Sequence, residues 1–88
     1  MSLKIISFKI ADPVKADAAQ NQITEDGHLK IAESTYLVST SKAIEILRRD
    51  LSPFFEKTDE LFISKVPANG YITFHFGKKK RDWIEEKI

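Results

Sequence analysis

The chain lacks cysteine altogether, and this absence excludes disulfide bridges and metal sites built on thiolates. It also lacks any apolar run near the roughly 20 residues that a membrane-spanning helix needs. Its first residues contain no apolar segment of the kind that secretory signal peptides carry. Together these absences predict a protein of the reducing cytoplasm that does not associate with a membrane.

An excess of one charge is also missing, since 14 lysines and arginines are balanced by 13 aspartates and glutamates. Global charge therefore exerts no pull toward nucleic acid or membranes, and any such attraction must come from local clusters. With 88 residues, the chain is predicted to form a single domain over residues 1–88. The core of so short a chain is thin, so we expect a homodimer.

The first third of the chain predicts a strand followed by a helix. Residues 4–10 alternate, and Ile6, Phe8 and Ile10 share one apolar face, which places them on the core side of a strand. Asp12 followed by Pro13 is a favourable helix start, because the carboxylate caps free amides and proline suits the first helical position. The turn-forming residues 24–27 are predicted to end this helix.

The middle of the chain changes its apolar face between residues 28 and 40. A flat strand does not explain this change, so the pattern predicts either a β-bulge near residues 32–34 or two short strands that meet there. Ser41 is then predicted to cap a helix that ends at Leu51, before Ser52-Pro53.

The last third predicts two strands and a short helix. Residues 60–66 are apolar on both faces, which is typical of an interior strand. Residues 71–76 alternate and predict another strand, and residues 78–88 predict a short helix.

This order of elements predicts an α+β protein with a ferredoxin-like two-layer sandwich (β-α-β-β-α-β) and a short C-terminal helix. Two helices would cover one face of the sheet and leave the other face bare. The side chains expected on the bare face are of mixed polarity, which suits contact with a second copy. The predicted dimer interface consists of Ile5, Ser7, Tyr71, Thr73 and His75.

Four segments carry a family resemblance: Glu33–Val38, Ile44–Leu47, Asp59–Lys65 and Asp82–Glu85. Together they resemble the small SinR-like proteins, which are similar to the small subunit of the CRISPR spacer-acquisition complex. The likeness covers about residues 28–88 and extends to the first strand. It implies an endoribonuclease-type family with a ferredoxin-like fold, a homodimer and an association with nucleic acid.

The resemblance also implies a position for the metal ligand of nuclease members, which place an acidic residue directly after an aromatic residue at the end of the first strand. Here Phe8 is followed by Lys9, whose ammonium repels a cation. The nearest acid is Asp12, which the helix start already requires. His28 and His75 have no metal-ligand spacing. We therefore predict no cofactor and no metal site, with Mg²⁺ entering only if Asp12 replaces the expected acid.

The strongest cluster of charge is Lys78-Lys79-Lys80-Arg81. It is either a solvated helix start or a phosphate-binding surface. Cations in the first turn of a helix oppose its dipole and cost roughly a few tenths of a kcal/mol each. A run of four such cations therefore favours the interpretation as a phosphate-binding surface. Lys9 is predicted to join this surface from the dimer cleft.

Other residues have two interpretations each. Tyr71, Phe76 and Trp83 either stack on bases or belong to the core. Arg48 and Arg49 either complement the end of their helix or extend the basic surface.

Three functions follow from these observations. The first is a non-catalytic nucleic-acid-binding or scaffold protein, which contacts DNA or RNA phosphates through Lys78, Lys79, Lys80, Arg81 and Lys9. The second is a metal-dependent endonuclease with a degenerate site at Asp12. The third is a protein-interaction module of a toxin–antitoxin or phage-defence system. We expect the first, because the acid needed for cleavage is missing.

Overall fold

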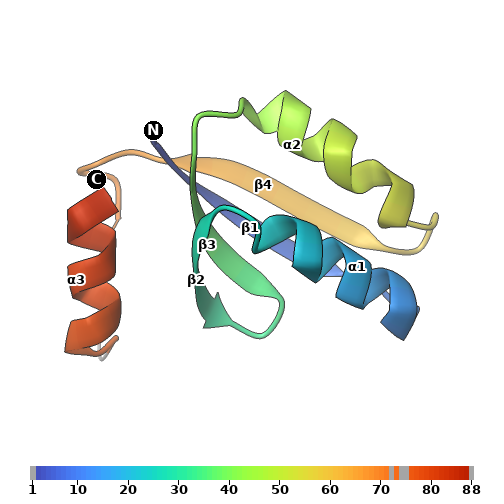
Figure 1. Ribbon diagram of the computed structural model, residues 1–88, viewed down its shortest axis with the longest axis horizontal. Coiled ribbons are helices and arrows are strands. Elements are labelled where there is room, and N and C mark those ends of the chain that lie inside the picture. Colours follow the sequence, from blue (N-terminus) through green and yellow to red (C-terminus); the bar gives the residue numbers. More distant parts are fainter. Residues whose placement is uncertain (1, 72, 74–75, 88) are drawn as a thin grey trace.

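The computed structural model describes residues 2–71, 73 and 76–87 (Figure 1). The elements follow in the order β1 (Ser2–Lys9), α1 (Pro13–Ile23), β2 (Gly27–Ala32), β3 (Thr35–Thr40), α2 (Ile44–Leu51), a 3₁₀ turn η1 (Ser52–Phe54), β4 (Glu60–Val66) and α3 (Lys78–Lys87). Within these residues, four strands form one antiparallel sheet in the order β2-β3-β1-β4, accompanied by three α-helices. The predicted α+β class is confirmed.

Strand β1 lies inside the sheet and contributes to both of its faces. Ile6 is opposite Tyr36 on one side and Ile63 on the other. Ile6 and Phe8 are buried on the face that α1 and α2 cover, as the alternation predicted, and Leu3 is buried on the opposite face. The period of two along β1 thus divides the protein into two apolar clusters.

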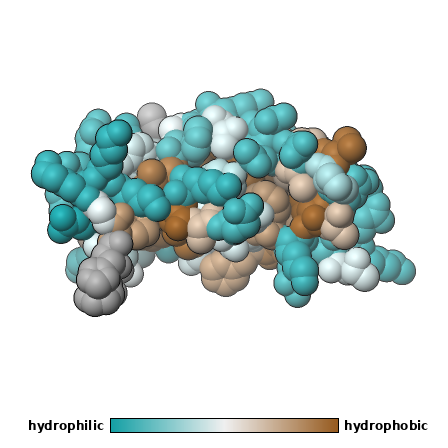
Figure 2. All heavy atoms as spheres, turned by 90° about the horizontal axis from the view of Figure 1, so that it is seen from below, coloured by the Kyte–Doolittle hydropathy of each residue, from teal (hydrophilic) through white to brown (hydrophobic). Residues whose placement is uncertain are grey.

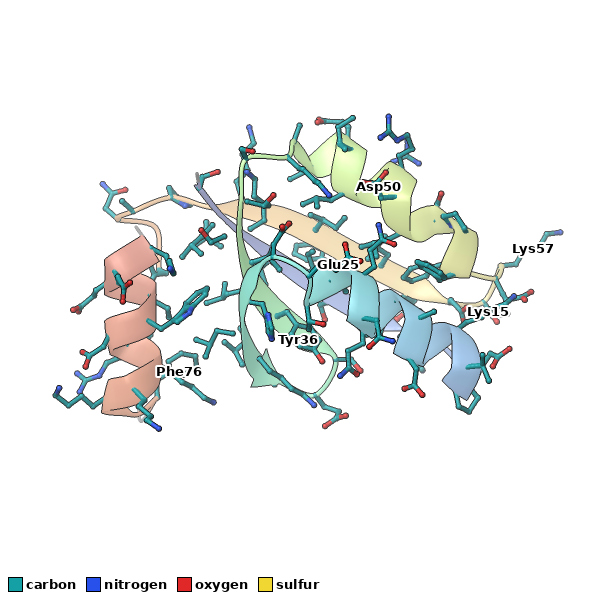
Figure 3. The ribbon with its side chains drawn as sticks, viewed as in Figure 1. Lys15, Glu25, Tyr36, Asp50, Lys57 and Phe76 are labelled. Carbon is teal, nitrogen blue, oxygen red and sulfur yellow. The ribbon has the colours of Figure 1, made fainter. Side chains whose placement is uncertain are left out.

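The larger cluster fills the space between the sheet and the helices α1 and α2. Tyr36 is 2 % exposed, and its ring stacks on Phe8 with 6.4 Å between centroids. Figure 3 shows Tyr36 between β3 and α1. Burial of each large apolar side chain contributes about 1.5–3 kcal/mol. The buried members are Ile6, Phe8, Ala19, Ile23, Tyr36, Val38, Leu47 and Leu51.

The smaller cluster lies on the other face, where α3 packs against the sheet. Leu3, Leu37 and Ile84 are buried there, and Ile5 and Trp83 pack against them. The β2–β3 hairpin accordingly lies between α3 and α1 (Figure 1). The expectation of a bare sheet face is therefore wrong where α3 covers it. Packing of α3 on the sheet removes the apolar surfaces of both elements from water.

The start of α1 is formed as the sequence predicted. The Asp12 carboxylate accepts a hydrogen bond of 2.9 Å from the amide of Val14, and Pro13 occupies the first position of the helix. Thr24 ends the helix by donating its amide to the carbonyl of Gln20.

The start of α2 differs from the prediction that Ser41 caps it. Ala43 occupies the N-cap position with extended backbone (φ −67°, ψ 155°), and no side chain bonds the helix start. Thr40 instead accepts a hydrogen bond of 3.2 Å from the amide of Lys42, which orders the connection before the helix. Ser41 was predicted from residue type alone, whereas the cap position depends on where the backbone turns.

Residues 28–40 contain both of the features that were predicted as alternatives. They form two strands joined by a tight turn, and the register between β2 and β3 shifts at residues 30–32, which marks a β-bulge. Ser34 in the turn has a φ of 55°, and its carbonyl accepts a hydrogen bond of 3.1 Å from the amide of Phe8. This bond ties the hairpin turn to the end of β1.

Among residues 2–71, 73 and 76–87, strand β4 lies at the edge of the sheet, and the predicted interior position is not found there. Within the described residues it pairs with β1 alone. Leu61 and Ile63 pack under the helices, whereas Phe62 between them is 62 % exposed on the other face. The next expected strand, 71–76, is not assigned at Tyr71, Thr73 or Phe76, and its other positions lie outside the described residues.

Candidate nucleic-acid interface

The basic run forms the first turn of α3. Gly77 precedes the helix with a φ of +87°, a conformation that residues with a Cβ seldom adopt. Its carbonyl accepts a hydrogen bond of 3.2 Å from the amide of Arg81, which closes the first turn. Lys78, Lys79 and Arg81 are exposed and Lys80 is half-buried. The turn thus presents most of its charge to solvent.

Two of the four cations have contacts of their own. Lys78 Nζ lies 3.0 Å from Asp82 Oδ2, in an exposed pair of the kind that contributes little to stability. Lys80 Nζ lies 5.0 Å from the centre of the Phe76 ring, which is within the range of a cation–π contact. The Phe76 side chain points toward the sheet from the end of the segment before α3 (Figure 3).

The other two cations are available to a ligand. Within residues 2–71, 73 and 76–87, no hydrogen bond or ion pair occupies the side chain of Lys79 or Arg81. The first turn of α3 contains no acidic residue. The positive end of the helix dipole therefore adds to four positive charges, and the combination favours an anion such as a phosphate. Figure 2 shows hydrophilic atoms gathered at the end of the molecule that carries this turn.

Lys9 lies far from the basic run within one chain. Helix α3 packs near the beginning of β1 through Leu3, and Lys9 ends the same strand six positions later. At about 3.3 Å per residue, the separation is about 20 Å. Figure 1 shows α3 and the end of β1 at opposite ends of the molecule. A single chain does not join Lys9 to the basic turn.

The aromatic candidates for base stacking divide into two groups. Trp83 and Phe76 pack against the smaller apolar cluster beneath α3. Tyr71 is 39 % exposed. For Trp83 and Phe76 the core interpretation is the one that their packing favours, and Tyr71 keeps a surface that a base can reach.

The residues predicted for the dimer interface do not behave alike. Ile5, Tyr71 and Thr73 line a cavity of about 360 Å³, which Ile84 of α3 also borders. The hydroxyls of Ser7 and Thr35 lie 2.9 Å apart in a hydrogen bond. The remaining predicted interface residue, His75, lies outside the described residues. Part of this surface is thus used by contacts inside the chain.

Asp12, the candidate acid of a degenerate nuclease site, is occupied as the cap of α1. The Nδ1 atom of His28 lies 3.0 Å from the carbonyl oxygen of Asp26. Across the described part of the chain, His, Asp and Glu side chains form no group of three or more that could hold a metal ion. A metal site at Asp12 would therefore need ligands from outside these residues.

Sequence reasoning missed the buried ammonium of Lys4, which is 4 % exposed. Its Nζ donates hydrogen bonds to the Ser2 hydroxyl at 2.6 Å and to the Thr40 carbonyl at 2.9 Å. The sequence contained an indication of this burial, because Lys4 lies at an even position of β1, on the same face as Ile6 and Phe8. Its contacts hold the first residues of β1 against the end of β3.

No family model, curated protein or solved structure matches this chain. None of the helices formed by the described residues is long and apolar enough to traverse a bilayer.

Proposed function

We propose that this protein is a non-catalytic nucleic-acid-binding or scaffold protein, related to the small subunit of CRISPR adaptation and acting as a homodimer. The resemblance carried by residues 28–88 supports this relationship. The strand order β2-β3-β1-β4, with a helix following β1 and another following β3, supports a ferredoxin-like arrangement.

The observation that carries the proposal is the exposed first turn of α3. Four adjacent cations occupy the positive end of a helix, and two of them, Lys79 and Arg81, have free side chains within the described residues. Phosphates of DNA or RNA are the ligands that such a surface attracts most strongly, because each contact releases condensed counterions. Lys9 at the position of the expected acid argues against cleavage, since it repels a divalent cation.

The test replaces Lys79 and Arg81 with glutamine and measures the binding of labelled oligonucleotides by fluorescence anisotropy over a range of salt concentrations. We expect weaker binding and a salt slope that is smaller by about 0.9 for each lost phosphate contact on duplex DNA. The matched control, Lys30→Gln with Lys57→Gln, removes the same charge from exposed positions elsewhere and is expected to keep the slope.

An unchanged affinity and an unchanged salt slope in the Lys79→Gln and Arg81→Gln protein would contradict the proposal. The same oligonucleotides, incubated with Mg²⁺ or Mn²⁺, are expected to remain intact. Cleavage that disappears in Asp12→Ala would instead favour the metal-dependent nuclease.

A further inference from the structure

The outer edge of β4 is the longer of the two edges of the sheet among the described residues. Seven residues, Glu60–Val66, pair with β1 on one side and with no described strand on the other. Residues 67–71, which follow β4, lead away from this edge rather than back along it (Figure 1). Proteins usually protect a long edge with charged side chains, a proline or a bulge; β4 carries Glu60 and Lys65 toward its ends, but its apolar centre has no such protection.

Both faces of this edge are apolar at its centre. Phe62 is 62 % exposed on the face opposite α1 and α2, next to Ser7 of β1. On the helix side, a groove of about 380 Å³ runs between β4 and α2. It is lined by Ile44, Glu45, Arg48, Leu61, Phe62 and Ile63. An added strand would therefore gain backbone hydrogen bonds and cover apolar surface on both faces.

We propose that β4 pairs in antiparallel orientation with β4 of a second copy of this chain, around a two-fold axis at Phe62. The two sheets then join into one continuous sheet, with the α1 and α2 helices of both copies on the same face. This inference comes from the edge of β4 and does not depend on the proposed nucleic-acid function.

The residues that this axis places opposite each other are chemically matched. Phe62 meets Phe62 of the second copy, and Leu61 meets Ile63. Ser64 lies opposite Glu60, so its hydroxyl, which donates to the carbonyl of Lys65 at 3.3 Å in the single chain, can rotate to donate to the carboxylate instead. Lys65, which is exposed, lies opposite Asp59, the residue before β4. Each such cross-strand pair contributes roughly 0.2–1 kcal/mol. The four kinds of complementary pair formed in this register therefore favour it over other registers.

Neighbouring registers lack this match. An axis at Ile63 places Leu61 opposite Lys65 and Phe62 opposite Ser64, so apolar side chains meet polar ones. An axis at Leu61 places Phe62 opposite Glu60. The self-complementarity of the Phe62 register is what identifies a second copy, rather than an unrelated peptide, as the occupant.

The helix side of the edge is also compatible with a two-fold axis. The axis reverses the direction of α2, so that Glu45 of one copy and Arg48 of the other face the joined groove. These side chains carry opposite charges, and both line the groove between β4 and α2 in each copy. Opposite charges across an interface favour the correct partner and register.

A cysteine at the axis tests the register directly, because the chain has no other cysteine. Opposed residues of an antiparallel pair lie about 4.5–5.5 Å apart between Cα atoms, which is within disulfide range. We expect Phe62→Cys to form a disulfide-linked dimer under mild oxidation. The control Val14→Cys, at a residue of α1 that is 76 % exposed, should stay mainly monomeric on a denaturing gel. A mixture of Glu60→Cys and Ser64→Cys should cross-link faster than either variant alone.

Sedimentation of the unmodified chain provides a second measurement. We expect a dimer whose dissociation constant rises by about tenfold or more in Phe62→Asp and is unchanged in Val14→Asp, with hydrogen exchange showing protection of amides along β4. A chain that stays monomeric at high concentration would overturn the proposal, as would a monomer that binds only an extended foreign peptide at this edge. A dimer that persists in Phe62→Asp with unprotected β4 amides would also overturn it, in favour of the sheet face or of an exchanged C-terminal segment. If Phe62→Asp fails to fold, the cross-linking result decides.

Discussion

At the scale of single residues, Asp59 shows how a loop is held by one carboxylate. Its Oδ1 accepts a hydrogen bond of 3.1 Å from the amide of Ala11, and its Oδ2 accepts one of 2.8 Å from the amide of Glu56. These backbone donors lower the pKa of Asp59 below its ordinary value of 3.8. Nearby, Glu56 forms an ion pair with Lys15 and raises the pKa of that ammonium. The loop before β4 is thus bonded to the β1–α1 connection at Ala11 and to the first turn of α1 at Lys15.

The lowered pKa of Asp59 predicts a pH dependence of stability. A carboxyl whose pKa is lower in the folded state stabilises the protein above its unfolded pKa, and this stabilisation is lost as the pH falls through the folded pKa. Asp59→Asn keeps one acceptor oxygen and loses the charge, so we expect it to lower the urea midpoint at neutral pH. The difference from the unmodified protein should shrink as the pH falls below the unfolded value for aspartate, about 3.9, and through the lower folded pKa. A constant difference across this range, measured by circular dichroism, would contradict this account.

At the scale of elements, α1 and α2 differ in how their first turns are satisfied. Helix α1 has the Asp12 cap, whereas Ala43 offers no side chain to the start of α2. The backbone of Ala43 is nevertheless extended, as a capping residue requires, and the residue is exposed. The backbone at the start of α2 therefore has the conformation of an N-cap, but the side chain there has no oxygen to accept a hydrogen bond.

We expect Ala43→Ser to stabilise the protein by about 1 kcal/mol, because a hydroxyl at this position can accept from a free amide of α2. The matched control is Ser41→Ala, which removes the residue that the sequence alone suggests as the cap. That substitution should change the free energy of unfolding little, because Ser41 is exposed and precedes the cap position. Urea unfolding of the two variants measures both effects. A loss of stability in Ser41→Ala equal to the gain in Ala43→Ser would show that the cap lies at Ser41 in solution.

At the scale of the whole molecule, β1 connects two apolar clusters on opposite faces of the sheet. The cluster beneath α1 and α2 is the larger, and the cluster beneath α3 depends on Leu3, Leu37 and Ile84. Helix α3 is thus held to the sheet mainly by apolar packing. Trp83 lies at this contact and is the only tryptophan of the chain, so its fluorescence reports whether α3 is docked.

Ile84→Ala is expected to cost about 2–5 kcal/mol, because Ile84 is 3 % exposed and its truncation leaves a cavity beneath α3. In the variant, the Trp83 emission should shift to longer wavelength at a lower urea concentration than the loss of helical circular dichroism. Val14→Ala, at an exposed position of α1, should leave both transitions in place. Coincident transitions at the original midpoint in Ile84→Ala would show that α3 does not rely on this contact.

The sequence by itself determined the features that depend on neighbouring residues. The Asp12–Pro13 helix start and the alternation of β1 were predicted correctly, since both follow from interactions within a few positions along the chain. The basic turn of α3 was visible for the same reason, because its four cations are consecutive.

Only the tertiary structure decided what lies opposite each element. The apolar pattern of residues 60–66 fits an interior strand and an edge strand equally well. It therefore did not reveal that Phe62 is exposed. It also did not reveal that α3 covers the second face of the sheet, or that β1 separates Lys9 from the basic turn. Strand order and packing partners join residues far apart in the chain, and local propensity and periodicity contain no information about such distances.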